Sequence, residues 1–307
     1  MTAYRLLDGP GDGLPGIYLD RYGPAAVMNV YEDAHLSKAS VTAAAQLTLE
    51  MLAPSGIEAV YVKPFARDRS RLGGRPPDES LAATPCAGRG QPESLIVREY
   101  GSRFEVRLYD GHSTGLFLDH REHRRALSQR KPSRVLNLFA YTCAFAVPLA
   151  AAGARVTNVD VSARYLEWGR RNLALNGVAL NGLEAPGARF FRMDAFKYLA
   201  YAARRREERF DLVILDPPTF GAGDSRRGVK PWKALENYPA LVEAALSVLA
   251  PGGLVFAASN TRELAATGAL ARLITRALGS APAWEPLPPW PVDVREAGRV
   301  AAVLFKP

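Results

Sequence analysis

Residues 134–177 read RVLNLFAYTCAFAVPLAAAGARVTNVDVSARYLEWGRRNLALNG, and this stretch decides the fold. It holds two apolar strand-like runs, at 134–139 and 155–161, and each is followed by a helical run, at roughly 142–152 and 162–176. Apolar strands that alternate with helices predict a mostly parallel sheet with helices on both faces. The stretch therefore predicts an α/β fold.

The same alternation continues to the end of the chain. Further strands are predicted at 189–194, 210–216, 253–259 and 299–305, with a short helix after the first and longer helices at 237–249 and 262–278. The uncharged stretch 135–154 is long enough to cross a membrane. Because it contains Asn137, Thr142 and Pro148 and divides into a strand, a turn and a helix, we reject a membrane span.

The N-terminal part of the chain has a different pattern. Short strand-like runs at 26–31 and 60–65 flank an Ala-rich helical run at 37–52, and a loop rich in Arg, Gly and Pro follows at 67–92. Two alternating runs across a Gly-Ser turn predict a β-hairpin at 95–110. We therefore expect a small N-terminal α+β domain at 1–92 and a second domain at 93–307 that includes this hairpin linker.

The composition, with 48% hydrophobic and 23% charged residues, is that of a globular protein. Two cysteines cannot form a disulfide framework, and the N-terminus lacks a signal pattern, so we expect a reducing, cytoplasmic location. Residues 1–114 contain 12 Lys and Arg against 14 Asp and Glu, whereas residues 115–307 contain 27 against 17. A basic second half suits a polyanionic partner such as nucleic acid, although a generally Arg-rich composition gives the same excess.

Ligands of open α/β sheets bind at the carboxyl ends of the strands. There the second strand of the alternating region delivers Asp160, whose carboxylate can accept both hydroxyls of a ribose or can simply begin the helix at Ser162. The turn after the first strand lacks the G-x-G-x-x-G pattern that binds a pyrophosphate. A ribose-bearing ligand without phosphates, such as S-adenosylmethionine (SAM), fits this turn better.

The segment DPPTF follows the strand at 210–216. Two prolines fix the backbone and remove two donors, which leaves the carboxylate of Asp216 and the carbonyls of Pro217 and Pro218 as acceptors for the edge of a nucleobase. The ring of Phe220 offers a face on which a base can stack. Alternatively, the prolines only end a strand and Phe220 belongs to the core.

The segment GLFLDHR, residues 115–121, joins the hairpin to the alternating region. Phe117 can flank an adenine and Arg121 can pair with a cofactor carboxylate, whereas Asp119 can equally be a helix cap. His120 and His123 form one short local cluster with no second ligand set, so we expect no metal site.

Four motifs together, YDGHSTGLFLDHREHRR, LNLFAYTCAFAV, VDVSARYLEWGRRNLALNG and LDPPTF, resemble the class I SAM-dependent methyltransferases that modify large-subunit ribosomal RNA. They are most similar to the guanine-N7 methyltransferase half of the bifunctional bacterial enzyme, while GDGLPGIYLDRYG near the N-terminus resembles the sister cytosine-5 branch. The resemblance implies a Rossmann-like, seven-stranded sheet with an antiparallel last strand. By this resemblance, Phe117, Asp119 and Arg121 cover the cofactor. Asn137, Phe139, Tyr141 and Thr142 line its methionine side, Asp160 binds its ribose, and Asp194 lies near its adenine amine. Residues 216–220 face the target base.

Two departures from the family pattern bear on the chemistry. Cys143 stands where the family usually has glycine, in a position expected to face the cofactor rather than the base. Cytosine-5 methylation needs a cysteine nucleophile, and the corresponding segment after residue 255 reads FAASN without one. The resemblance therefore implies direct methyl transfer to a base nitrogen, guanine N7, in 23S ribosomal RNA.

The sequence offers two basic clusters for gripping RNA. The cluster after DPPTF, made of Arg226, Arg227, Lys230 and Lys233, is the better candidate because it follows the expected base site, and the other lies within residues 121–131. Two alternatives stay open at this point: a SAM-dependent small-molecule methyltransferase, and a catalytically inactive RNA-binding relative.

Overall fold

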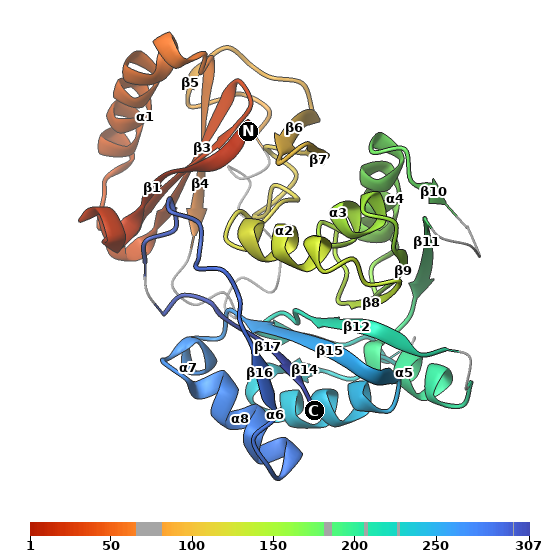
Figure 1. Ribbon diagram of the computed structural model, residues 1–307. Coiled ribbons are helices and arrows are strands. Elements are labelled where there is room, and N and C mark those ends of the chain that lie inside the picture. The colour runs from red at the N-terminus through yellow and green to blue at the C-terminus, as the bar shows by residue number, and fades with distance from the viewer. Residues whose placement is uncertain (66–81, 181–185, 206–207, 226–227, 297) are drawn as a thin grey trace. The chain divides into compact units, whose positions relative to one another are not determined.

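The computed structural model describes residues 1–65, 82–180, 186–205, 208–225, 228–296 and 298–307. The chain forms two compact units, and each is described by itself (Figure 1). Unit 1 comprises Met1–Arg121 and Trp290–Glu296, and unit 2 comprises Glu122–Pro289 and Ala297–Pro307. The division expected at residues 92–93 thus differs from the observed one, and most of the predicted loop at 67–92 lies outside the described residues.

Unit 1 is built on a five-stranded sheet with the order β1-β2-β3-β4-β5. The parallel pair β3 and β4 is connected through helix α1, and the other neighbours are antiparallel. Ser37 caps α1 by accepting from the Ser40 amide at 3.1 Å. The elements are β1 (Ala3–Asp8), β2 (Ile17–Tyr22), β3 (Ala25–Tyr31), α1 (Lys38–Leu52), β4 (Ala59–Phe65) and β5 (Ala87–Gly88), with short 3₁₀ turns at Gly9–Asp12, Glu32–Ala34 and Ala53–Ser55.

The predicted hairpin forms from β6 (Leu95–Glu99) and β7 (Ser102–Val106), which ends earlier than expected. The hairpin belongs to unit 1 because the Thr2 amide donates to the Arg98 carbonyl at 2.9 Å. The Tyr22 hydroxyl likewise donates to the Leu116 carbonyl at 3.3 Å. These contacts place the compact boundary after the hairpin and the segment that follows it.

A lysine is buried in the sheet of unit 1. Lys63 of β4 is 1% exposed, and its amine donates to the carbonyl oxygens of Gly111 at 2.5 Å and His112 at 3.5 Å. Burial lowers the pKa of Lys63 to about 7, although the Asp110 carboxylate acts in the opposite direction. Lys63 therefore ties the segment after the hairpin to strand β4 of this unit.

This lysine predicts a pH dependence of stability. Above pH 7 the folded chain releases a proton that the unfolded chain keeps up to its ordinary pKa of 10.5, so the free energy of unfolding rises with pH in that window. Relative to Lys63→Met, we expect wild-type protein to gain up to about 1 kcal/mol per pH unit between about pH 7 and 9. Urea unfolding of both proteins at several pH values measures this, and parallel curves for the two proteins would contradict it.

Unit 2 contains an eight-stranded sheet with the order β10-β11-β9-β8-β12-β15-β17-β16. The strands from β10 to β15 run parallel, and β17 is antiparallel to both β15 and β16. The predicted class I sheet with its antiparallel last strand is confirmed, with the two-residue β10 as an additional edge strand. The strands are β8 (Arg134–Leu138), β9 (Arg155–Asp160), β10 (Ala179–Leu180), β11 (Gly187–Arg192), β12 (Phe210–Leu215), β15 (Leu249–Ser259), β16 (Ala283–Glu285) and β17 (Ala301–Lys306), beside a separate pair of β13 (Phe220–Gly221) and β14 (Trp232–Lys233).

Helices cover both faces of this sheet (Figure 1). Helices α5, α6 and α8 pack on one face over a core that includes Leu136, Val213 and Val255. On the other face α2 and α3 meet β15, since His123 and Phe145 both pack against the Phe256 ring. The helices are α2 (Arg121–Gln129), α3 (Ala146–Ala151), α4 (Ala163–Leu175), α5 (Ala195–Ala203), α6 (Ala234–Leu246), α7 (Arg262–Ala265) and α8 (Ala269–Leu278).

Two predicted helices differ from the observed ones. The helix expected at 262–278 is divided into α7 and α8 by Gly268, which adopts a left-handed conformation with φ of 69°. The helix expected from residue 142 begins at Ala146 because the preceding residues form a tight loop. The uncharged stretch 135–154 is a strand, a turn and a helix, as predicted. Among the described residues, there is no helix with the length and apolar character needed to cross a membrane.

Candidate functional site

The loop after β8 is the most strained segment at the carboxyl edge of the unit 2 sheet. Phe139, Tyr141 and Cys143 all have positive φ angles, of 54°, 49° and 61°. Such angles are unfavourable for residues with a side chain and persist only where surrounding contacts hold them. Here the Ala140 amide donates to the Val159 carbonyl at 3.0 Å, which ties the loop to the end of β9. Backbone strain of this kind concentrates at ligand-binding sites.

Asp160, at the end of β9, organises this edge. Its two carboxylate oxygens accept the amides of Tyr141 at 2.9 Å and Ser162 at 2.8 Å. Burial raises the pKa of Asp160, while these amides favour the ionised form and limit the rise. A carboxylate oxygen can accept more than one hydrogen bond, so both remain able to accept a hydroxyl. The paired acceptors match the two hydroxyls of a ribose.

Asn172 and Gly169 of helix α4 contact the loop after β8 (the β8 loop), and the sequence patterns did not identify either residue. The Asn172 side-chain amide, fully buried, donates to the Thr142 carbonyl at 2.9 Å. A β-carbon built on Gly169 would collide with the side chain of Cys143. Cys143 therefore points into α4, and Gly169 provides the space that its sulfur occupies. A glycine inside a predicted helix is the sequence signal that could have identified this contact.

Gly169→Ala is expected to lower the free energy of unfolding by about 1–3 kcal/mol, the usual cost of overpacking a core. Cys143→Gly removes the colliding side chain and suits the positive φ at that position, so it should restore most of the loss in the double variant. Urea unfolding of the two single variants and the double variant measures the coupling. Equal losses for Gly169→Ala with and without Cys143→Gly would contradict the assigned contact.

The environment of Cys143 also bears on its chemistry. The thiol is fully buried, and burial raises its pKa well above the ordinary value, so it stays protonated. A cysteine nucleophile needs a thiolate that faces the substrate, whereas the Cys143 thiol is protonated and points into α4.

Asn137 and Asp194 both have structural partners. The buried Asn137 side chain donates to the Asn158 side-chain oxygen at 3.0 Å, between paired strands β8 and β9. Asp194 follows β11 and caps α5, since it accepts the Lys197 amide at 3.2 Å. Their predicted roles toward the methionine and the adenine of a cofactor stay predictions.

The segment after β12 differs in one respect from its predicted form. The Pro218 carbonyl, expected to face outward as an acceptor, accepts the indole N–H of Trp232 at 2.7 Å. The Thr219 carbonyl accepts a hydrogen bond from the Ala234 amide at 3.1 Å. The Thr219 hydroxyl donates to the Asn260 side-chain oxygen at 2.9 Å. The segment is therefore fixed by β14 and by the end of β15, and the acceptor array is smaller than expected.

Phe220 begins β13 and is 59% exposed, so the alternative that it belongs to the core is wrong. Trp232 of the paired strand is buried instead, with its ring centroid 5.2 Å from that of Phe139. After Phe220 the chain surrounds an open hollow of about 570 Å³. The hollow is lined by Ala222, Gly223, Asp224, Ser225, Val229 and Pro231.

The basic cluster after DPPTF is described in part. Lys230 and Lys233 are exposed, and Lys233 pairs with Glu236 at 2.9 Å. Arg226 and Arg227 lie outside the described residues.

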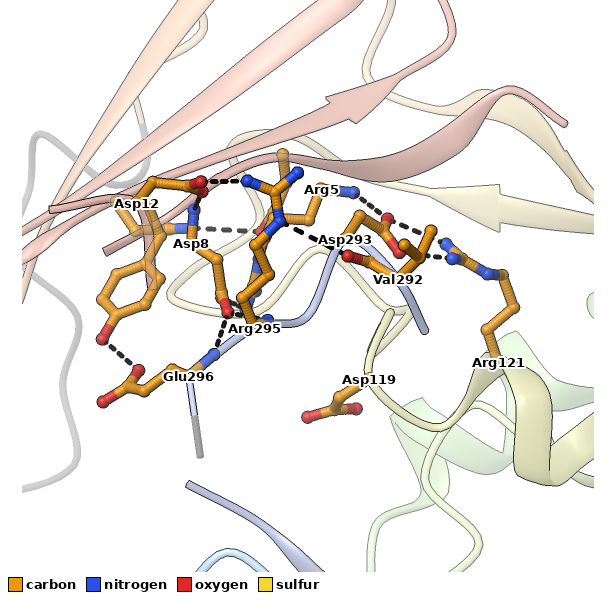
Figure 2. Close-up of polar contacts among 12 residues, drawn as sticks. Arg5, Asp8, Asp12, Asp119, Arg121, Val292, Asp293, Arg295 and Glu296 are labelled. Atoms are coloured by element: carbon orange, nitrogen blue, oxygen red, sulfur yellow. Dashed lines mark hydrogen bonds and ion pairs between the residues drawn. The ribbon is translucent and has the colours of Figure 1, made fainter. Parts of the chain in front are cut away.

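The other predicted cofactor residues belong to unit 1. Phe117 is exposed, and Asp119 accepts the amide of its neighbour His120 at 2.9 Å. Arg121 is 2% exposed, and its guanidinium forms a two-pronged ion pair with Asp293 (Figure 2). Arg121 was expected to pair with a cofactor carboxylate, but here a carboxylate of the protein takes this geometry.

The segment Trp290–Glu296 that supplies Asp293 is fixed to unit 1 by further polar contacts (Figure 2). Asp293 also accepts the Arg5 amide at 2.8 Å, and the buried Asp8 carboxylate accepts the amides of Arg295 and Glu296. Arg295 pairs with Asp12 as well. These pairs span more than 170 positions of the sequence, and the sequence pattern gave no sign of them.

His120 and His123 have different neighbours, the ring of Trp290 and the ring of Phe256. Over the part of the chain that the structure describes, no group of three or more His, Cys, Asp and Glu side chains is arranged to hold a metal ion.

Comparison with known proteins agrees with the fold of the chain. The family of S-adenosylmethionine-dependent methyltransferases matches residues 81–306. "Ribosomal RNA large subunit methyltransferase I" of Klebsiella pneumoniae is 35% identical over 259 residues, which are 83% of this chain, and the chain spans 59% of that relative's length.

Solved structures have the same fold. The SAM-dependent methyltransferase structure from Streptococcus mutans is 25% identical with a TM-score of 0.79, and the comparison covers 99% of this chain and 74% of that one. The SMU.776 structure, with the same values, is complexed with SAH, S-adenosylhomocysteine. A SAM-dependent methyltransferase from Agrobacterium tumefaciens is 22% identical with a TM-score of 0.66, covering 100% of this chain and 91% of that one. The family match over most of its length means that this chain belongs to the S-adenosylmethionine-dependent methyltransferases.

Proposed function

We propose that this protein transfers the methyl group of SAM directly to a guanine N7 in large-subunit, 23S, ribosomal RNA. The observation that carries the proposal is the exposed aromatic ring of Phe220, four residues after Asp216, which follows the carboxyl end of β12. An exposed aromatic ring in the segment after β12, whose partner strand β14 packs on the loop after β8 through Trp232 and Phe139, is suited to stacking a base. The rRNA large-subunit relative from Klebsiella pneumoniae supports the substrate class.

The residues of the carboxyl edge fit SAM. Asp160 is positioned by two backbone amides and presents paired acceptors to a ribose, and the strained β8 loop lies beside it. Bound SAM supplies an activated methyl group on a sulfonium. In this proposal Asp160 binds the ribose of SAM. Phe139, Tyr141, Thr142 and Asn137 are assigned to its methionine side. The assignments of Asp194 to the adenine, and of Phe117 and Asp119 to the cofactor, are part of the same proposal, whereas the Arg121 guanidinium is engaged by Asp293 and is not assigned to the cofactor.

Methyl transfer to a ring nitrogen uses the lone pair of that nitrogen, so the protein has to align the base and needs no covalent intermediate. We assign this alignment to Asp216, Pro217 and Phe220, while Pro218 supports the segment through Trp232. The buried, protonated Cys143 leaves the second unit without a thiolate near this edge, which disfavours cytosine-5 transfer.

The charge of the chain suits RNA. The net charge is +8, and its excess lies in residues 115–307. Lys230 and Lys233 are exposed in the segment that follows Phe220, and we assign them, with Arg226 and Arg227, to phosphates of the RNA in the cytoplasm.

Transfer of tritium from methyl-labelled SAM tests the proposal. The acceptors are large-subunit rRNA purified from a strain that lacks this gene and, separately, the small-metabolite fraction of the same cells. We expect label in the rRNA and none in the metabolites. Label in metabolites alone would support the small-molecule alternative and overturn the proposal. Absence of label in both, with no binding of S-adenosylhomocysteine, would support an inactive relative.

A further inference from the structure

A cluster of arginines lies at the opposite edge of the unit 2 sheet, where the strands begin. Arg134 is the first residue of β8, and Arg155, the first of β9, is its partner in the strand register. Arg189 of β11 is the register partner of Thr157, two residues further along β9. Side chains two apart on a strand share a face, so the three arginines project on one side of the sheet. This is the side that carries α5, because Tyr198 of that helix packs on Phe191 of the same strand as Arg189.

The Glu208 carboxylate contacts two of these arginines. Glu208, in the segment between α5 and β12, accepts two hydrogen bonds from Arg189, at 3.1 and 2.8 Å. Arg134 reaches the same carboxylate at 4.0 Å. Arg189 also donates to the Thr157 hydroxyl at 3.1 Å. Arg189 thus forms the closest contacts with Glu208, and Arg134 lies at the outer limit of an ion pair with the same carboxylate.

The neighbouring segment adds further positive charge. Arg204, Arg205 and Arg209 lie on the stretch that carries Glu208, and the first two are exposed. The carboxylate of Asp211, at the start of β12, accepts the amides of Ser133 and Arg134 at 3.0 and 2.8 Å. Arg204, Arg205 and Arg209 thus add three arginines to the three on the strands, in the stretch that also holds the carboxylates of Glu208 and Asp211.

The arginines also repel one another. The pKa of Arg155 is lowered first by burial and then by the positive charges of Arg134 and Arg189, and Glu208 compensates in part. Like charges held close together repel one another, so the protein gains stability when an anion binds among them.

We propose that this arginine cluster is a second contact for the RNA substrate and binds phosphates of its backbone, away from the reacting base. This inference rests on the proposed function. Strands β8 and β9 separate the cluster from the predicted base site by about 15–20 Å, at about 3.3 Å per residue. A folded RNA can contact both edges of the sheet across this separation. We therefore expect a folded RNA to bind better than a single nucleotide or a short strand. Guanidinium groups pair well with phosphate oxygens, which gives affinity without sequence preference.

Two variants test the cluster without disturbing the Arg189–Glu208 pair. Arg204→Glu with Arg205→Glu changes exposed positions, and Arg155→Gln removes one charge at the strand edge. The matched control is Arg272→Glu with Arg276→Glu, which makes the same charge change at exposed positions of α8. Binding of purified large-subunit rRNA is measured over a range of salt concentrations, methyl transfer is measured at varied RNA concentration, and S-adenosylhomocysteine binding is a check of folding.

We expect the Arg204/Arg205 double variant to weaken rRNA binding about tenfold, and each lost phosphate contact to reduce the slope of log affinity against log salt by about 0.7–0.9. The KM for rRNA should rise while kcat and S-adenosylhomocysteine affinity stay unchanged, and Arg155→Gln should show a smaller effect in the same direction. The control should bind rRNA like wild type.

If wild-type protein labels rRNA and both variants keep the wild-type KM and salt slope, the cluster proposal is overturned and the proposed function is not. An equal loss in the α8 control would overturn it too, because the effect would then follow net charge. If wild type labels no rRNA, the proposed function and this inference both fail.

Discussion

Asp160→Asn is expected to weaken S-adenosylhomocysteine binding about 100-fold, which corresponds to about 2.8 kcal/mol. The carboxylate oxygens accept the amides of Tyr141 and Ser162, so an asparagine must turn its NH₂ group toward one of these N–H donors. The variant therefore loses a charge-assisted acceptor for the ribose and also disturbs the β8 loop. Isothermal titration calorimetry measures the change directly.

The control for this variant is Asp211→Asn. Asp211 also accepts two backbone amides, of Ser133 and Arg134, but at the amino edge of the strands. One oxygen of Asp211 accepts both amides, so Asp211→Asn can keep both hydrogen bonds and reports the loss of a carboxylate charge away from the predicted cofactor site. We expect the control to bind S-adenosylhomocysteine like wild type. Equal affinities of wild type and Asp160→Asn would contradict the assignment of the ribose to Asp160.

Phe220→Ala is expected to reduce kcat/KM for rRNA methylation about 5- to 150-fold, through the loss of about 1–3 kcal/mol of base stacking. Because Phe220 is exposed, its removal should leave the unfolding free energy and S-adenosylhomocysteine affinity close to wild type. Steady-state methyl transfer with rRNA as the varied substrate measures the effect.

Two further substitutions separate stacking from simple apolar contact. Phe220→Tyr keeps an aromatic face and should retain most of the activity, whereas Phe220→Leu keeps apolar volume without a π face and should resemble Phe220→Ala. If Phe220→Leu is as active as wild type, the ring does not stack a base.

The sequence predicted those parts of unit 2 that depend on local pattern. The alternation of strands and helices from residue 134 onward predicts the sheet, and Asp160 and Asp216 lie where their strands end. The prolines after Asp216 indicated a rigid exit from β12, although not the indole donor that engages the Pro218 carbonyl. That donor comes from Trp232, whose approach depends on the pairing of β13 with β14.

Features that depend on distant segments were not predictable from pattern. The fit of Cys143 against Gly169 requires the packing of α4 on the β8 loop, and the Arg121–Asp293 pair joins residues 172 positions apart. The return of Trp290–Glu296 to unit 1 likewise moves the observed boundary, because contacts rather than chain order define a compact unit. A single sequence holds no record of such pairings, whereas turn and strand patterns are local.

Nucleoside analysis distinguishes direct methyl transfer to a guanine nitrogen of rRNA from transfer to other atoms. Large-subunit rRNA from a strain without this gene is incubated with the protein and SAM that carries a deuterated methyl group, then digested and examined by mass spectrometry. We predict labelled 7-methylguanosine that requires Asp160 and Phe220. Labelled 5-methylcytidine, or no labelled nucleoside in the presence of bound cofactor, would contradict the account.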